Sequence, residues 1–143
     1  MNLCPCGARG DPAAECSCPP QRLAAYREKL SRALLDRFDL VVGVPRARSR
    51  EVAGPDGEPS AEVARRVAGA AVRLGEEPPV VGEDASCLLR RAVDQLGLSA
   101  RGYARAARVA TTIAALAGGG RVQPDHVAEA LSYRAPRGLS LAA

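Results

Sequence analysis

The stretch that decides the fold is SARGYARAARVATTIAALAGGG, residues 99–120. Ser99 is a favourable helix cap, and the three glycines at the other end stop a helix. Between them, apolar side chains recur every three or four residues, as at Val109 and Ile113. This stretch therefore predicts one long amphipathic helix, from a cap at Ser99 to about Ala117.

Helical patterns continue on both sides of this stretch. We expect three further helices: from a cap at Ser60 to about Leu74, from a cap at Asp84 to about Leu96 before Gly97, and from Pro124 onward. Four amphipathic helices joined by short loops favour a packed bundle.

The first 45 residues follow a different pattern. A helix is predicted to start at Pro20, with Leu23, Tyr26 and Leu30 at helical spacing. The segment FDLVVGVP, residues 38–45, then predicts a short buried strand. The backbone groups of a lone strand need neighbouring strands, and this sequence hardly offers any. The first 45 residues therefore look like the end of a larger α/β domain.

The predicted fold class is mainly α: the remnant of an α/β core with one helix, one strand and a cysteine-rich loop, followed by a helical bundle. The boundaries we expect are a core remnant at 1–45, a linker rich in turn residues at 46–59, a helical domain at 60–135 and a tail at 136–143.

Composition excludes some functions. One Phe, three Tyr and no Trp exclude an aromatic stacking platform for nucleic-acid bases. The net charge of +4 permits contact with DNA but does not argue for it. Because the sequence has neither a membrane-length apolar run nor a signal peptide, we expect a soluble, cytoplasmic protein without membrane contact. Thiols stay reduced there, which disfavours a disulfide framework.

Cysteines are crowded at one end of the chain. They form two Cys-x-Cys pairs, Cys4 with Cys6 and Cys16 with Cys18. A metal site, a disulfide clamp and a redox switch are the possible explanations. Four thiolates suit a tetrahedral zinc ion, and the alternative is a set of four reduced thiols in a loop. Cys87, within a predicted helix, is interpreted as a small buried apolar residue.

Two long stretches resemble a known family. NLCPCG, the second Cys-x-Cys and LLDRFDL lie within residues 2–46, and LSARGYARAARVATTIAALAG and HVAEALSYR lie within 96–134. They resemble the second half of the AAA+ core and the C-terminal lid of magnesium-chelatase-like ATPases of the ComM type. The predicted remnant and bundle would then be the end of an AAA+ core and its lid domain.

The resemblance implies roles for three residues. Arg37 matches the arginine finger, Asn2 the sensor-1 residue that orients the attacking water, and Arg101 the sensor-2 residue that contacts nucleotide. ATP and Mg²⁺ are the implied cofactors, with a homohexamer and DNA processing in natural transformation as the implied context. Arg105 and Arg108 share a helix face with Arg101 but are weaker candidates. His126 is interpreted as structural.

The sequence lacks a phosphate-binding loop. Its single lysine, Lys29, lies in a predicted helix, and no apolar run ends in Asp-Glu to hold magnesium. We therefore expect no ATPase activity from this chain alone. A fragment, a mis-started reading frame and a gene remnant all fit this pattern.

Two other functions remain open for this sequence. The main alternative is a non-catalytic helical interaction module with a zinc-binding cysteine loop. An independent zinc-dependent DNA-binding domain fits the low aromatic content and the modest charge less well.

Overall fold

The computed structural model describes residues 2–11, 13–45 and 47–134. It divides into two compact units: unit 1, with described residues up to Gly54, and unit 2, Pro55–Arg134. Helices are the main regular structure of the described residues, and the two short strands form only one small sheet, which confirms the mainly-α fold class. None of the helices in these described ranges is long and apolar enough to cross a lipid bilayer.

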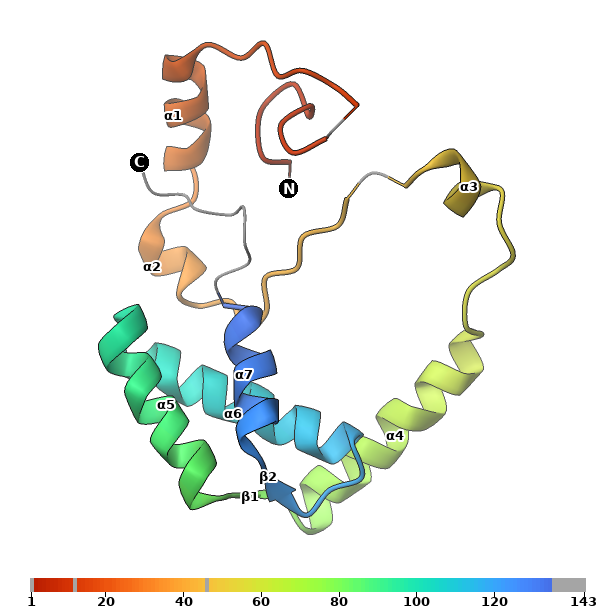
Figure 1. Ribbon diagram of the computed structural model, residues 1–143, viewed down its shortest axis with the longest axis vertical. Coiled ribbons are helices and arrows are strands. Elements are labelled where there is room, and N and C mark those ends of the chain that lie inside the picture. Colours follow the sequence, from red (N-terminus) through yellow and green to blue (C-terminus); the bar gives the residue numbers. More distant parts are fainter. Residues whose placement is uncertain (1, 12, 46, 135–143) are drawn as a thin grey trace. The chain divides into compact units, whose positions relative to one another are not determined.

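Unit 2 is a small helical bundle with one central helix. Its helices are α4 (Ser60–Glu76), α5 (Glu83–Leu96), α6 (Ala100–Leu116) and α7 (Pro124–Ser132). Helix α6 packs against the other three, and α5 also packs against α7 (Figure 1). The four helices predicted from the apolar periodicity are therefore all present.

The core of unit 2 is made of alanine side chains around three larger ones, Leu89, Val122 and Val127. Ala106, Ala110 and Ala114 lie four residues apart along α6 and are fully buried. They belong to the same apolar cluster as Leu89 of α5 and Val127 of α7. Alanines at this spacing form a smooth helix face, so neighbouring helices can approach closely.

Two helix ends in unit 2 are as predicted. The Ser99 hydroxyl accepts a hydrogen bond from the Gly102 N–H at 3.0 Å and caps α6. Gly97 ends α5 in the left-handed conformation, with φ of 62°, which glycine adopts without steric cost.

The predicted caps at Ser60 and Asp84 are wrong. The cap positions are Pro59 and Gly82, whose backbones are extended, and neither helix has a side-chain cap. Ser60 and Asp84 therefore lie inside the first turns. An acidic residue there still interacts favourably with the helix dipole.

A two-strand parallel sheet links two of the connections between helices at one end of the bundle. Strand β1 (Val80–Val81) pairs with β2 (Arg121–Val122), with Val80 opposite Arg121. The sequence predicted a loop at β1, because two residues are too few to show an alternating pattern. The sheet fixes the α4–α5 connection to the α6–α7 connection (Figure 1).

The described residues of unit 1 form three short helices, α1 (Pro20–Glu28), α2 (Arg32–Leu35) and α3 (Ser49–Val52). The helix predicted from Pro20 is interrupted after Glu28. The Ser31 hydroxyl accepts a hydrogen bond from the Leu34 N–H at 3.1 Å and starts a new turn. Helix α3 lies in a segment predicted to be a linker without helices.

The strand predicted at residues 38–45 is absent from the described part of the chain. Leu40, Val42 and Val44 are 51%, 62% and 87% exposed. The sequence pattern is that of a strand, but unit 1 supplies no described strand to pair with it, so the backbone ladder cannot form.

Candidate metal centre

The first cysteine pair lies on a tight turn. The Gly7 N–H donates to the Cys4 carbonyl at 3.1 Å, and Gly7 has φ of 82°. This backbone conformation is strained for residues with a side chain, which explains glycine directly after the pair. The turn brings the sulfurs of Cys4 and Cys6 to 3.3 Å from each other.

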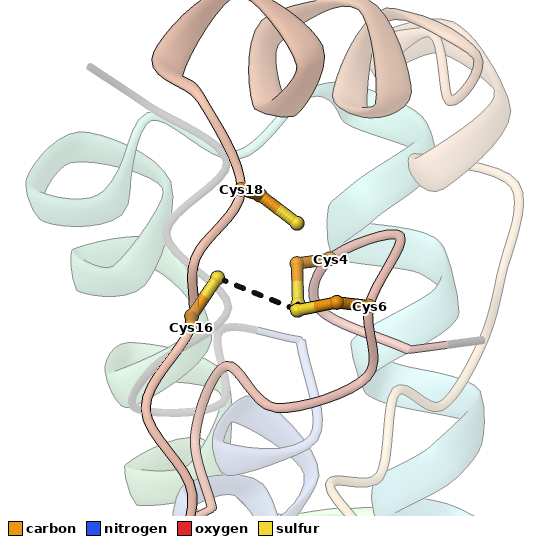
Figure 2. A group of neighbouring side chains, drawn as sticks. All are labelled: Cys4, Cys6, Cys16 and Cys18. Carbon is orange, nitrogen blue, oxygen red and sulfur yellow. Dashed lines mark hydrogen bonds between the residues drawn. The ribbon is translucent and has the colours of Figure 1, made fainter.

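The second pair approaches from the segment that leads into α1. The Sγ atoms of Cys6 and Cys16 are 3.7 Å apart. The four sulfurs of Cys4, Cys6, Cys16 and Cys18 all lie within 4.8 Å of one another. Figure 2 shows the four side chains pointing toward one another. Residues up to 14 positions apart in sequence therefore meet in one cluster, as the zinc hypothesis requires.

The geometry of the cluster fits a tetrahedral metal ion. In a four-thiolate zinc site the Zn–S bond is about 2.3 Å, which places the sulfurs about 3.8 Å apart. The separations of 3.3 Å and 3.7 Å, and the 4.8 Å limit for the set, bracket that value. A donor set of sulfur alone favours zinc over magnesium or calcium, which prefer oxygen.

Hydrogen bonds already favour a negative charge on one sulfur. Burial raises the pKa of Cys4, but the Arg9 N–H at 3.3 Å and the neighbouring thiols outweigh it and lower the pKa to about 6. For Cys16, a backbone hydrogen bond at Cys18 lowers the pKa. Burial and hydrogen bonds with the neighbouring thiols outweigh this effect and raise the pKa to about 11. The pKa of Cys18 is raised, first of all by hydrogen bonding with Cys6. The thiolate of Cys4 is thus favoured, while Cys16 and Cys18 hold their protons more firmly.

The cluster is closed on one side. Cys4 is fully buried, Cys16 and Cys18 are half-buried, and Cys6 is exposed. Because four protein sulfurs would fill a tetrahedral shell, no position is left for a catalytic water. The arrangement is suited to a structural metal rather than a catalytic one.

All five cysteines are free thiols, and the fifth contradicts its prediction. Cys87 is exposed, whereas its neighbour Leu89 is fully buried. The helix turns Cys87 away from the core because the residue two positions later occupies the inner face. Its prediction as a buried apolar residue is wrong.

The residues implied by the family resemblance are all exposed. Asn2 lies next to the cysteine turn, and its main-chain carbonyl accepts a hydrogen bond from the Tyr26 hydroxyl at 3.1 Å. Arg37 follows α2, and its N–H donates to the Leu34 carbonyl at 2.9 Å. Arg101 lies in the first turn of α6. Asn2 and Arg37 belong to unit 1, and Arg101 belongs to unit 2.

The weaker candidates, Arg105, Arg108 and His126, lie on helices α6 and α7. Arg105 is half-buried and Arg108 is exposed, both on α6. His126 accepts a hydrogen bond through Nδ1 from the Gln123 N–H at 3.1 Å, which forms part of the cap of α7. His126 therefore has a structural role at that helix end.

Sequence reasoning missed two contacts of the cysteine loop. The Arg9 main chain donates to Cys4, and Tyr26 holds Asn2 across 24 residues. Tyr26 was recognised only as part of an apolar helix face. A hydrogen bond between residues 24 positions apart produces no local sequence pattern, so the sequence could not have revealed the bond from Tyr26 to Asn2.

Two families match successive parts of the chain. "Magnesium chelatase, subunit ChlI" matches residues 1–52, and "Magnesium chelatase, subunit ChlI C-terminal" matches residues 76–134. The first match contains the cysteine cluster and Arg37, and the second contains α5, α6 and α7. The chain is therefore of the magnesium-chelatase class, with the ChlI region first and the ChlI C-terminal region after it.

Curated relatives agree with this class. The competence protein ComM of Haemophilus influenzae is 35% identical over 133 residues, 81% of this chain and 26% of its own length. The uncharacterized protein Rv2897c of Mycobacterium tuberculosis is 38% identical over 154 residues, 93% of this chain and 30% of its own. YifB of Escherichia coli is 33% identical over 138 residues, 82% of this chain and 27% of its own.

The chain belongs to the magnesium-chelatase-like family and is of the ComM type. It spans between 26% and 30% of the length of these relatives.

Proposed function

We propose that this chain acts as the C-terminal part of a cytoplasmic AAA+ ATPase, within a homohexamer that processes DNA during natural transformation. It supplies an arginine finger, sensor residues and a helical lid, and it depends on a partner segment for the phosphate-binding loop, ATP and Mg²⁺. The similarity to a competence protein supports this context.

The cysteine cluster holds one structural zinc ion in this proposal. The observation that carries it is the convergence of four sulfurs within 4.8 Å, from two pairs separated by a loop. A zinc ion would fix a loop that has little apolar core of its own, because binding free energy is then also folding free energy.

The domain boundaries proposed here are a core part at 1–45, a linker at 46–59, a lid at 60–135 and a tail at 136–143. Leu40, Val42 and Val44 are exposed and alternate along the chain. They form no strand in the described chain, and in this proposal they would pair only when the partner segment supplies neighbouring strands. Pairing there would satisfy the backbone and cover these side chains.

Arg37 acts as the arginine finger in this proposal. Its side chain is exposed at the end of α2, as a group that reaches a neighbouring subunit must be. A guanidinium is permanently charged and can meet two phosphoryl oxygens at once. It stabilises charge that develops in the transition state, so its removal affects turnover more than ATP binding.

Asn2 and Arg101 complete the proposed nucleotide contacts. Asn2 orients the attacking water. Arg101, on the lid, contacts bound nucleotide and so couples the nucleotide state to the angle of the lid. Their exposure leaves both side chains accessible to a ligand.

The experiment that tests this function uses an active full-length ComM-type relative. Replacing the arginine that corresponds to Arg37 by Ala should cut ATP turnover by on the order of 10³-fold and leave ATP affinity nearly unchanged. Mixing these subunits with subunits that lack the phosphate-loop lysine should restore part of the activity, because each defect then meets an intact neighbour. Full turnover in the Arg37→Ala oligomer would contradict the proposed role.

The second candidate is a non-catalytic helical interaction module that keeps the zinc loop. The cysteine cluster favours it, because four sulfurs within 4.8 Å suit a structural metal and leave no position for a catalytic water. Both candidates predict that the purified chain neither binds ATP tightly nor hydrolyses it. Turnover that follows the chain through a sizing column would contradict this prediction. Activity restored by adding the phosphate-loop segment of a relative would favour the ATPase over the interaction module.

A further inference from the structure

Asn2 and the cysteine cluster are physically connected. Asn2 lies two residues before Cys4, the most buried of the four ligands. Its carbonyl accepts the 3.1 Å hydrogen bond from Tyr26 on α1, the helix that begins directly after the second cysteine pair. The two ends of the loop are thus tied together by a bond outside the cluster itself.

Packing inside the loop reinforces this connection. A Cβ atom placed on Gly7 would lie 3.4 Å from the side-chain amide nitrogen of Asn2. The Asn2 side chain therefore lies over the turn between Cys4 and Gly7. A Cβ atom on Gly10 would come within 2.8 Å of Leu3 Cδ1. The residues before Cys4 therefore rest against the loop that follows Cys6.

We infer that metal occupancy of the four cysteines sets the position of Asn2, with Tyr26 as the positioning residue. Without a metal, the two cysteine pairs are joined to each other through the contact between the Cys6 and Cys16 thiols, which are weak donors and acceptors. With a metal, four coordination bonds fix Cys4 and the turn beneath Asn2. The Tyr26 hydroxyl then fixes the Asn2 backbone against α1.

This coupling has a consequence for catalysis, and that consequence rests on the proposed sensor role of Asn2. A residue that orients an attacking water must be held to about 0.5 Å. Loss of the metal would then lower turnover in the complete ATPase without removing any group that touches ATP. The structural coupling itself needs no catalytic role.

The test exploits the fact that Asn2 is the only asparagine in the chain. In protein labelled with ¹⁵N-asparagine, one pair of side-chain amide signals therefore reports on Asn2 alone. We compare metal-free full chain with the same chain carrying one equivalent of ZnCl₂ under reducing conditions. Zinc should shift the pair from its position in the metal-free chain and raise its heteronuclear NOE.

Two variants separate coupling from simple folding. Tyr26→Phe removes the hydroxyl and keeps the ring, so it should change zinc affinity by less than about tenfold, while the Asn2 signals stay near their metal-free position when zinc is added. Tyr133→Phe is the matched control, because the Tyr133 hydroxyl bonds to Glu129 in unit 2. Its Asn2 signals should respond to zinc as in the unmodified chain.

Three results would overturn the inference. Zinc bound at one per chain with unchanged Asn2 signals would show that the site and Asn2 are independent. A Tyr26→Phe chain that responds like the unmodified one would remove Tyr26 from its role. A chain that binds no zinc, as elemental analysis would show, would end this inference together with the zinc proposal. A failed arginine-finger experiment would leave the NMR result standing.

Discussion

The two units differ in what is buried inside them. Unit 2 encloses a cluster of alanine, leucine and valine side chains from its helices and β2. Among the described residues of unit 1, the only buried apolar side chain is Cys4. Apolar burial stabilises a fold by about 25 cal/mol per Å², so unit 2 has a source of stability that unit 1 lacks. From this difference we expect the stability of unit 1, but not that of unit 2, to depend on the cysteine cluster.

The largest expected effect is metal loss from unit 1. Protein purified without chelator should carry about one zinc per chain, and Cys16→Ser with Cys18→Ser should carry none. Because structural zinc contributes about 10 kcal/mol or more in small zinc-binding peptides, amide exchange in residues 2–37 should then become fast. Exchange in α5 and α6 should stay slow.

Cys87→Ser is the matched control for this experiment, because Cys87 is exposed and lies in unit 2. It should keep both the zinc and the protection of unit 1. Equal protection of residues 2–37 in the zinc-free and zinc-loaded chains would refute the dependence of unit 1 on the metal.

A smaller effect is expected from a cavity in unit 2. Leu89→Ala truncates a fully buried side chain of the core. It should lower the free energy of unfolding of unit 2 by about 2–5 kcal/mol in urea titrations. The zinc content should not change. Leu96→Ala is the control, because Leu96 is 57% exposed. A loss of zinc in Leu89→Ala would show that the two units are not independently stabilised.

The smallest effect tests the packing of the cysteine loop. Gly10 has φ of 89°, and a Cβ atom there would approach Leu3 Cδ1 to 2.8 Å. Gly10→Ala should therefore cost unit 1 about 1–2 kcal/mol, measured as a roughly tenfold weaker zinc affinity in a competition titration. Gly43→Ala is the control within unit 1, because no atom lies within 4 Å of its Cβ position. Equal zinc affinities in the two variants would contradict the described loop.

The sequence was informative where the signal is local. Ser99 and Gly97 mark helix ends through hydrogen bonding and backbone conformation within a few residues, and both were predicted correctly. The crowding of four cysteines also predicted their convergence. Their arrangement in space follows from two tight pairs and a short loop, which leave few alternatives.

Features that depend on distant partners could not be predicted. The segment at residues 38–45 has the composition of a strand, but a strand exists only when another strand accepts its hydrogen bonds. The sheet between β1 and β2 shows the opposite case, because Val80 and Val81 pair with residues 41 positions away. The bond from Tyr26 to Asn2 likewise depends on the folded loop.

The alanine row on α6 restricts which sequences this family member can acquire. Ala106, Ala110 and Ala114 have no exposed surface. Shrinking them to glycine removes one methyl group and costs about 1 kcal/mol in helix propensity. Enlarging them forces the helices apart, at about 1–3 kcal/mol for each overpacked position. Drift at these three sites should therefore be one-sided: homologous sequences should show Gly, Ala or Ser there, and rarely Val, Leu or an aromatic residue.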